Sequence, residues 1–393
     1  MSHDKQNAPE NAPLKGLRVV EFGQYIAVPA CGQTMAELGA DVIKVEPPEG
    51  DAGRYAGWNG DHYGPLFSAY NRSKRSVVLD LRDPDGRQNA FALACTADVV
   101  LQNYRPGVME KLGLHAAALT GKMPRLVYGQ VSGFGQTGPA SQRAGFDIAA
   151  QAESGMMSIN GDGDRDPTRV GFTVVDVMAA NALTSGVLAA LLRRSVSGQG
   201  GIVDVSLVDV AVSALSSTWA DYRLTGVVPV RSGNGQTNAT PAAEVMPTAD
   251  GNLVISAYTK EHFARLCAAL DRPEIAADPR FCESAARLHN RAAMLVDLRG
   301  ATRRFSTADL CERLTRAGVV FGTVRTMAEV RPGQAGVSAD LFVKVHAAGR
   351  EPLLLPGCPA TFHDYSRHEG RLPDIGEHTA EVLADLSLLR KAL

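Results

Sequence analysis

Signatures of metal binding, disulfide bonding and the commonest catalytic loops are sparse in this sequence of 393 residues. Its six cysteines stand far apart without a CxxC pair, a pattern that fits a reducing compartment and neither a zinc site nor a disulfide framework. The nine histidines are dispersed and show no metal-like spacing. The motifs GxxxxGKS/T, GxSxG and HExxH are missing, which removes the simplest phosphate-loop, serine-hydrolase and zinc-protease interpretations.

An excess of charge of one sign is lacking too. The formal net charge is -2, so we expect no nucleic-acid partner. Residues 1–13 are polar and contain no apolar signal-peptide core, and we interpret them as a flexible tail. The most apolar segment, residues 174–192, has the length of a membrane span, but polar residues such as Asp176 and Asn181 interrupt it. We therefore expect a buried helix there, no membrane partner and a cytoplasmic location.

The first half of the chain alternates short β-rich runs with helix-like runs. This alternation predicts parallel strands joined by helical crossovers, which is a Rossmann-like, doubly wound α/β domain. Residues 197–215 add a further strand and helix. The predicted strands are residues 16–23, 41–48, 76–81, 97–104 and 124–135, and the predicted helices are residues 29–40 and 84–96.

The length of the chain exceeds what one core usually serves, so we predict two domains. Helix-like runs at residues 260–270, 288–305 and 308–319 follow a strand at residues 252–257 and indicate a small α+β domain. From about Val324 the chain is predicted to be irregular, with a closing helix at residues 376–386. The predicted boundaries are 14–220 for the large domain, completed by 325–393, then 221–242 for a linker and 243–324 for the small domain.

Cationic side chains lie in several loops that follow the predicted strands, where open α/β sheets bind ligands. Arg82, Arg105 and Lys111 flank such turns, and Arg72, Lys74 and Arg75 stand together in NRSKRS. These groups suit a phosphorylated ligand, although solvated surface charge is the commoner meaning of any one of them.

The order of motifs GLRVVEFG, AELGADVIKVEPPEGD, NRSKRSVVLDLR, QNYRPGVMEKLG, VYGQVSGFGQTGP and GFDIAAQAESG resembles the class III coenzyme A transferases, which include the carnitine and bile-acid CoA transferases. Later motifs extend the match from about Pro13 to Leu383. The resemblance implies an enzyme that moves CoA from an acyl-CoA thioester to a small free carboxylic acid. It also implies an interlocked homodimer with CoA and acyl-CoA as substrates, and no permanently bound cofactor or metal.

Asp147, taken alone, is either a helix cap or a nucleophile. The resemblance aligns it with the family's nucleophile, which attacks the thioester to form an aspartyl anhydride and then an aspartyl-CoA thioester. Backbone amides around Gly133 and Phe134 are expected to stabilise oxyanions, with a simple tight turn as the alternative. The loop Gly233, Asn234, Gly235 and Gln236 aligns with a mobile glycine loop that shields the site in relatives, with a plain flexible linker as the alternative.

The resemblance also assigns CoA contacts. Ile26 stands where the formyl-CoA transferase branch has Gln, and Pro47 where that branch has a basic residue, so oxalate or formate is not expected as the acid. We expect the acid contacts to come from residues 57–65 and the linker, with succinate as a family-level expectation for the donor. The expected CoA contacts are Tyr25, Ile26, Leu79, Arg82, Asn103, Tyr104 and Lys111.

Two alternatives to CoA transfer stay open. The α-methylacyl-CoA racemases resemble this chain throughout, but they have His directly before the motif aspartate, where this chain has Phe146. Racemisation needs two proton-transfer groups and Phe cannot transfer a proton. This leaves Asp176, the second carboxylate position, as a structural residue such as a helix cap. A CoA-binding protein without activity is the second alternative, and the intact Asp147 argues against it.

Overall fold

The computed structural model describes residues 9–236, 241–334 and 336–392. The chain divides into two compact units. Unit 1 comprises Met1–Met156, Val170–Asp221 and Pro332–Leu393, and unit 2 comprises Met157–Arg169 and Tyr222–Arg331. The domain boundaries stay predictions. They differ from these units in placing residues 157–169 and 325–331 with the large domain and in setting residues 221–242 apart as a linker.

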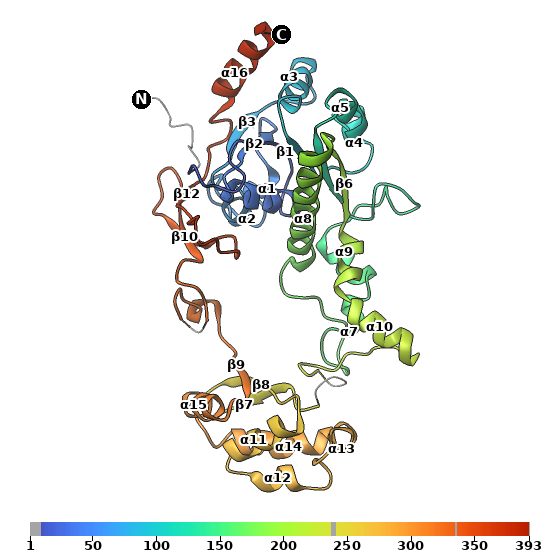
Figure 1. The fold of residues 1–393 in the computed structure, drawn as a ribbon, viewed down its shortest axis with the longest axis vertical. Coiled ribbons are helices and arrows are strands. Elements are labelled where there is room, and N and C mark those ends of the chain that lie inside the picture. Colours follow the sequence, from blue (N-terminus) through green and yellow to red (C-terminus); the bar gives the residue numbers. More distant parts are fainter. Residues whose placement is uncertain (1–8, 237–240, 335, 393) are drawn as a thin grey trace. The chain divides into compact units, whose positions relative to one another are not determined.

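A six-stranded parallel sheet forms the centre of unit 1 (Figure 1). Its strand order is β3-β2-β1-β4-β5-β6, and each neighbouring pair runs parallel. The predicted parallel α/β layer and all of its predicted strands are confirmed. The strands are β1 (Arg18–Phe22), β2 (Asp41–Glu46), β3 (Arg75–Val78), β4 (Val99–Gln102), β5 (Val127–Ser132) and β6 (Gly201–Ser206).

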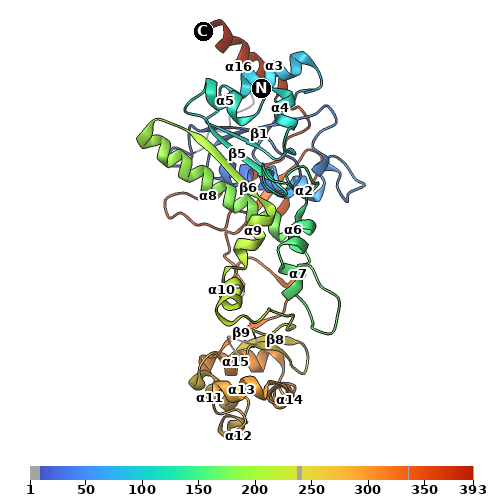
Figure 2. The ribbon, with the colours of Figure 1, turned by 90° about the vertical axis from the view of Figure 1, so that its right-hand side faces the viewer.

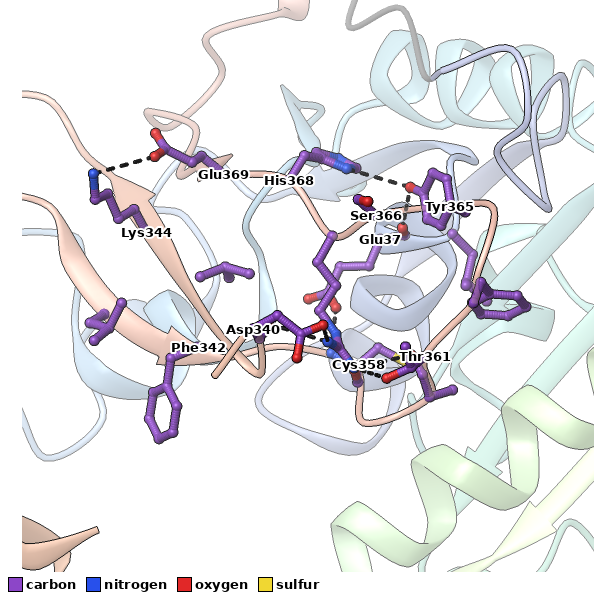
Figure 3. Close-up of a pocket in the computed structure, with 16 residues that line it drawn as sticks. Glu37, Asp340, Phe342, Lys344, Cys358, Thr361, Tyr365, Ser366, His368 and Glu369 are labelled. Carbon is purple, nitrogen blue, oxygen red and sulfur yellow. Dashed lines mark hydrogen bonds and ion pairs between the residues drawn. The ribbon is translucent and has the colours of Figure 1, made fainter. Parts of the chain in front are cut away.

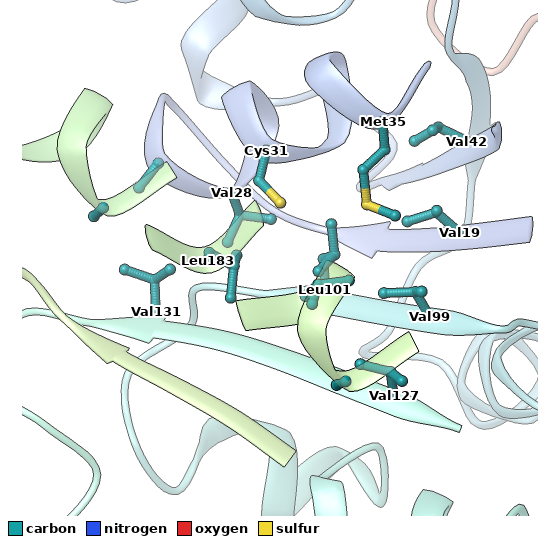
Figure 4. Packing of buried hydrophobic residues seen from close by; sticks show 14 of the residues in the cluster. Val19, Val28, Cys31, Met35, Val42, Val99, Leu101, Val127, Val131 and Leu183 are labelled. Carbon is teal, nitrogen blue, oxygen red and sulfur yellow. The ribbon is translucent and has the colours of Figure 1, made fainter. Parts of the chain in front are cut away.

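Helices cover both faces of this sheet because alternate residues of each strand point to opposite sides. Val19 and Val42 pack with α1 (Ala27–Glu37) and α8 (Val174–Ser197) on one face, as Figure 4 shows. Val20 and Ile43 pack on the other face, with α3 (Pro84–Ala94), α5 (Ala116–Lys122) and α16 (Thr379–Ala392). The predicted helices 29–40, 84–96 and 376–386 correspond to α1, α3 and α16.

Helix α8 is long and apolar enough to cross a membrane by length and composition alone. It packs along β5, β6 and α1, with Leu183 and Val187 fully buried in the core of unit 1. The predicted helix is confirmed, but its burial only in part, because 39% of its apolar window is buried and Leu192 and Val196 are exposed. The remaining helices of the first 225 residues are η1 (Ala52–Arg54), α2 (Pro65–Tyr70), α4 (Val108–Leu112), α6 (Asp147–Glu153), α7 (Met156–Ile159), α9 (Leu207–Ala214) and α10 (Ser216–Thr225).

A second, three-stranded sheet completes unit 1, so the prediction of an irregular chain after Val324 is wrong in part. Its order is β11-β10-β12, with β10 (Phe342–His346) between β11 (Leu353–Pro356) and β12 (Gly370–Arg371). These strands have five, four and two residues, which is too short for a clear alternation in the sequence.

Unit 2 contains an antiparallel sheet with a helical layer. The predicted strand at 252–257 and the predicted helices of this region are confirmed. The elements are β7 (Glu244–Pro247), β8 (Asn252–Ser256), α11 (Lys260–Ala269), α12 (Pro273–Ala277), α13 (Ser284–His289), α14 (Arg291–Thr302), α15 (Thr307–Ala317), β9 (Val320–Thr323) and η2 (Met327–Glu329).

Part of the predicted N-terminal tail, residues 1–8, lies outside the described residues. The rest of it packs onto unit 1, because Ala12 is buried and the Asn11 side chain donates a hydrogen bond to the carbonyl of Asp364. The prediction of a loose tail is therefore wrong at Asn11 and Ala12.

Candidate active site

The topology of the sheet directs attention to the loops after β1 and β4. The chain proceeds from β1 toward β2 and β3 on one side, and from β4 toward β5 and β6 on the other. Doubly wound sheets bind ligands at such a reversal of strand order, outside the carboxyl ends of the strands. Tyr25 and Ile26 follow β1, and Asn103 and Tyr104 follow β4, so four of the predicted CoA contacts lie at this point.

Asn103 joins these two loops directly. Its Oδ1 accepts a hydrogen bond from the Gln24 backbone N–H at 2.9 Å, and its Nδ2 donates to the Gln24 carbonyl at 2.8 Å. The Gln24 side chain in turn donates to the Tyr104 hydroxyl at 3.1 Å. Tyr25 then adopts a left-handed backbone with φ of 62°, which is uncommon for a residue other than glycine. Asn103 therefore fixes the shape of the β1 loop.

Asp147 lies at a junction of two helices. It is the first residue of α6, as the sequence allowed, and is only 3% exposed. Its Oδ2 accepts hydrogen bonds from the backbone N–H groups of Val175 at 2.7 Å and Asp176 at 3.4 Å. Its Oδ1 accepts from Gln151 Nε2 at 2.5 Å. Asp147 therefore caps α8, a helix that begins 27 residues further along the chain.

The N-terminus of α8 lacks a cap from its own neighbour, since the side chain of Thr173, the N-cap residue, makes no capping hydrogen bond. The free N–H groups of a helix N-terminus carry partial positive charge and stabilise a negative charge placed there. Asp147 supplies that charge from α6, which packs against α8 and α9 (Figure 2). The choice between cap and nucleophile is thus no longer exclusive, because a carboxylate that caps α8 is also held in a fixed orientation.

Gln151 connects Asp147 to the segment before α8. It is fully buried, and its Oε1 accepts a hydrogen bond from the Val170 backbone N–H at 2.8 Å. Through its two ends Gln151 ties α6, Asp147 and the approach to α8 into one unit. No role for Gln151 was predicted from the sequence. Its position four residues after Asp147, on the same face of one helix, was the available signal.

The turn after β5 approaches the Asp147 segment closely. A Cβ on Gly133 would lie 2.8 Å from the Gly145 Cα, so both positions require glycine. Gly133, Gly135 and Gly138 also have the GxGxxG spacing of dinucleotide loops directly after a strand, a signal that the sequence reasoning missed. No helix opens at this turn, however, since α6 begins only at Asp147. The pattern therefore lacks the helix N-terminus that a pyrophosphate needs.

Aromatic side chains and unpaired polar atoms surround this turn. The Tyr25 and Phe146 rings meet edge to face with centroids 6.0 Å apart, and Phe146 is 61% exposed. Phe134 lies beneath the Arg143 guanidinium, 4.5 Å from it. Ser132 Oγ and Gln136 Nε2 are buried without a hydrogen-bond partner in the described part of the chain. Such atoms are candidates for contacts with a bound substrate.

Asp176 is the third residue of α8, so it lies in the first turn of the helix and is not its cap. The interpretation of Asp176 as a helix cap is therefore wrong. Burial, and then the negative charge of Asp147, raise the pKa of Asp176 to about 7. The structure thus brings Asp176 next to Asp147 at the start of one helix, although the sequence separates the two residues by 29 positions.

The predicted nucleotide contacts lie toward the edge of the sheet. Leu79 is buried directly after β3, the edge strand, and Ile26 is buried at the start of α1. Arg82 is 74% exposed and pairs with Asp80 and Glu49. Lys111 and Arg105 are exposed, and neither has an ion-pair partner among the described residues, so both keep their charge available to a phosphate.

The prediction that Arg72, Lys74 and Arg75 form a surface or phosphate-binding cluster is wrong. Arg72 and Lys74 are buried and Arg75 is half-buried, because carboxylates on neighbouring elements neutralise all three. The pairs are Arg72 with Glu37, Lys74 with Glu21, and Arg75 with Asp41.

Lys74 belongs to a larger buried ion network under the β1 loop. Lys44 Nζ lies 3.0 Å from Glu21 Oε1 and 2.7 Å from Asp51 Oδ2, and it donates to the Gly23 carbonyl at 2.7 Å. Burial lowers the pKa of Lys74 to about 8, against the attraction of Glu21. Burial acts in the same direction on Lys44, but its neighbouring carboxylates outweigh this and raise its pKa. The buried ion network consists of Glu21, Lys44, Glu46, Asp51, Arg54 and Lys74.

The predicted glycine loop, residues 233–236, lies in unit 2. Gly233 has φ of 69° and donates its N–H to the Gly161 carbonyl at 3.1 Å. The Gln236 side chain accepts a hydrogen bond from the Tyr258 hydroxyl at 3.1 Å. Both ends of the loop are thus anchored within unit 2, and its role as a shield stays a prediction.

A cavity of about 380 Å³ lies elsewhere in unit 1, between α1 and the β10 sheet (Figure 3). Its charged side chains are already paired, as Lys344 is with Glu369 and Arg367 with Asp340. None of the predicted site residues lines it. Within the described ranges, no group of three His, Cys, Asp or Glu side chains is placed to hold a metal ion.

Comparison with known proteins agrees with this architecture. Residues 14–379 match CoA-transferase family III. The chain is 35% identical to the succinate–glutarate CoA-transferase of Agrobacterium fabrum, over 96% of this chain and 97% of that protein. It is also 35% identical to the succinyl-CoA–D-citramalate CoA-transferase of Chloroflexus aurantiacus, over 95% and 94% respectively.

A solved structure of a CaiB/BaiF family protein from Brucella suis superposes with a TM-score of 0.83 at 33% identity, covering 97% of this chain and all of that one. The chain therefore belongs to CoA-transferase family III. It is a CoA-transferase, as the sequence resemblance predicted.

Proposed function

We propose that this enzyme moves CoA from an acyl-CoA thioester to a free carboxylic acid through covalent intermediates on Asp147. An Asp147 oxygen attacks the thioester carbonyl carbon, the carbon–sulfur bond breaks, and CoA leaves as a thiolate. The thiolate then attacks the Asp147 carbonyl and releases the donor acid, leaving an aspartyl-CoA thioester. The acceptor acid reverses the two steps and departs as the new acyl-CoA.

The observation that carries this proposal is the position of the Asp147 carboxylate. It is held by two backbone N–H groups of α8 and by Gln151, and a fixed orientation is what a nucleophile requires. The apolar side chains of Phe146 and Ile148 flank it on the surface. When a substrate covers Asp147 and these apolar side chains, water is kept from the anhydride and cannot hydrolyse it.

We assign CoA binding to the loops at the carboxyl end of the sheet. Tyr25 and Ile26 face the pantetheine, Asn103 and Tyr104 shape its path, and Leu79 and Arg82 lie near the nucleotide. Lys111 meets a phosphate. Gly133 and Phe134 line the reacting centre, and the loop 233–236 shields it.

The names of the relatives support a dicarboxylic donor, and we propose succinyl-CoA with a second small dicarboxylic acid as acceptor. The enzyme acts as an interlocked homodimer in the cytoplasm, without a bound cofactor or metal. Mass spectrometry of the products formed from succinyl-CoA and a panel of acids identifies the acceptor. Sedimentation of the purified protein tests the dimer.

Replacement of the nucleophile tests the mechanism. We expect Asp147→Ala to abolish exchange between succinyl-CoA and a free acid, while binding of CoA in a calorimeter persists. Asp164→Ala, which removes an exposed carboxylate, is the matched control and retains activity. Full exchange activity in Asp147→Ala would overturn the proposal.

The racemase alternative has one supporting observation: Asp176 lies next to Asp147, and the charge of Asp147 acts on its carboxyl group. Racemisation exchanges the α-proton of the acyl group with solvent without any acceptor acid. Rapid uptake of solvent deuterium into a 2-methylacyl-CoA, measured with no acid present, would favour it. We expect no uptake, because Phe146 stands where the racemases have the His that transfers a proton.

A further inference from the structure

Asp176 is a carboxyl group without a counter-charge beside the proposed nucleophile. It is half-buried in the first turn of α8, and its backbone N–H points to Asp147 Oδ2. In residues 9–236, 241–334 and 336–392, no side chain forms an ion pair with its carboxyl, and none donates a hydrogen bond to it. Asp147, in contrast, accepts hydrogen bonds from three donors. The two carboxyl groups therefore differ in the number of hydrogen bonds that hold them.

The surroundings of Asp176 contain acids and no described cation. Asp147 faces it from α6, and Tyr70 faces it from α2. Burial, and then the charge of Asp176, raise the pKa of Tyr70, so the phenol does not relieve the repulsion. Two neighbouring carboxyl groups do not both ionise readily, and one proton is retained by the pair. Asp147 accepts three hydrogen bonds, whereas the described residues donate none to the Asp176 carboxyl, so we assign the proton to Asp176.

We propose that Asp176 holds a proton during turnover, and that loss of this proton sets the alkaline limit of the enzyme. The inference rests on the proposed function, since it takes Asp147 as the nucleophile. In that mechanism, a carbon–oxygen bond forms at Asp147 as the carbon–sulfur bond breaks, and the thiolate carries away the electron pair. No proton is gained or lost in the step.

Asp176 is therefore a positioning residue rather than an acid or base. Its proton limits the resident charge of the site to that of Asp147. Every other reactant that must approach, whether a carboxylate or a thiolate, is itself an anion. A second fixed anion would repel each of them at close range. The pKa of about 7 for Asp176 places the change in the range where activity is measured.

Asp176→Asn tests this proposal, because the amide has the shape of the carboxyl group and stays neutral at every pH. For the wild type, we expect kcat/KM with succinyl-CoA and glutarate to fall about tenfold per pH unit above pH 7. The variant should match the wild type within about threefold at pH 6 and stay flat to about pH 9. Glu153→Gln, on α6 and 43% exposed, is the matched control and should keep the wild-type fall.

Two results would overturn the proposal. Loss of activity in Asp176→Asn at every pH, in a folded protein, would make Asp176 an acid or base. An unchanged alkaline fall would show that its proton is irrelevant. An unchanged alkaline fall together with an inactive Asp147→Ala would contradict only the role of Asp176. An active Asp147→Ala would contradict the proposed function itself.

A direct measurement covers the case in which Asp176→Asn does not fold. Carboxyl carbon NMR of protein labelled at aspartate should show one carboxyl that titrates near pH 7 in the wild type. In Asp147→Asn, which lacks the neighbouring charge, this titration should move to lower pH. Absence of the titration, or no movement, contradicts the proposal.

Discussion

Unit 1 holds two groups of acidic side chains in opposite ways. In the buried ion network, three acids face three cations, and Glu21 alone contacts both Lys44 and Lys74. At the start of α8, Asp147 and Asp176 lie together with no cation among the described residues beside them. Backbone N–H groups and one amide hold Asp147 instead. Charges that are neutralised on all sides maintain structure, whereas a charge held only by dipoles remains available for chemistry.

The two groups are connected through the β1 loop. The Lys44 ammonium binds the Gly23 carbonyl, and the Tyr25 backbone N–H donates to Asp51 at 3.4 Å. Tyr25 in turn contacts Phe146, the residue before Asp147. The buried ion network thus supports the wall of the site that contains Asp147 and Asp176.

Removal of one cation from the network should have the largest effect on stability. Lys44→Met leaves Glu21 and Asp51 buried without their shared partner, and we expect a loss of about 3–5 kcal/mol. Urea unfolding followed by circular dichroism measures it. Lys344→Met is the matched control, because its partner Glu369 is exposed and the side chain itself is 63% exposed. Equal stability of the two variants would contradict the distinction between the two groups.

Removal of one donor from Asp147 should have an intermediate effect. Gln151→Leu deletes a buried hydrogen bond to a charged group, and we expect a loss of about 1–3 kcal/mol. Because the Asp147 carboxylate would then be less well oriented, kcat should also fall by about tenfold. Steady-state kinetics with succinyl-CoA measures this.

Gln151→Glu separates the two contacts of this side chain. It keeps an acceptor for the Val170 N–H but loses the donor to Asp147. It should therefore reduce kcat at least as much as Gln151→Leu. A wild-type kcat in either variant would show that Gln151 does not orient the nucleophile.

The smallest effect concerns stability and pH. The folded state binds a proton at Asp176 up to about pH 7, whereas an unfolded aspartate releases it near its ordinary value of 3.8. Stability from this group is therefore complete below pH 4 and is lost as pH rises to 7. Asp176→Asn should exceed the wild type by about 1 kcal/mol at pH 8 and by less at pH 5. Thermal unfolding at both pH values measures the difference, and a constant difference would contradict the shift.

The sequence predicts the main sheet well because each of its strands carries its own local signal. β1, β2 and β4 are apolar, β-branched runs that end at Gly, Pro or Asn, and the helices between them imply parallel crossovers. The sheet around β10 was not predicted, because two-residue β12 forms only by pairing with a strand some 25 positions earlier. Its stability comes from tertiary contacts that no local pattern records.

The proposed nucleophile was predicted from the sequence, but the residues that hold it were not. Asp147 was identified from the motif order, but its partners on α8 lie 28 and 29 positions later. Lys74 was interpreted as surface charge, because the local sequence does not show that Glu21, two strands away in the sheet, pairs with it. Local patterns therefore locate reactive groups, whereas long-range pairing determines which charges are neutralised.

The cap that Asp147 provides for α8 has a consequence for the covalent stages that we propose. An anhydride or thioester at Asp147 is uncharged, so the first N–H groups of α8 lose their anionic acceptor during those stages. They are then free to attract another anion, and the carboxylate of the incoming acid is one. A single helix end can in this way hold the resting enzyme in order and, once each turnover has begun, guide the next reactant to the carbon it must attack.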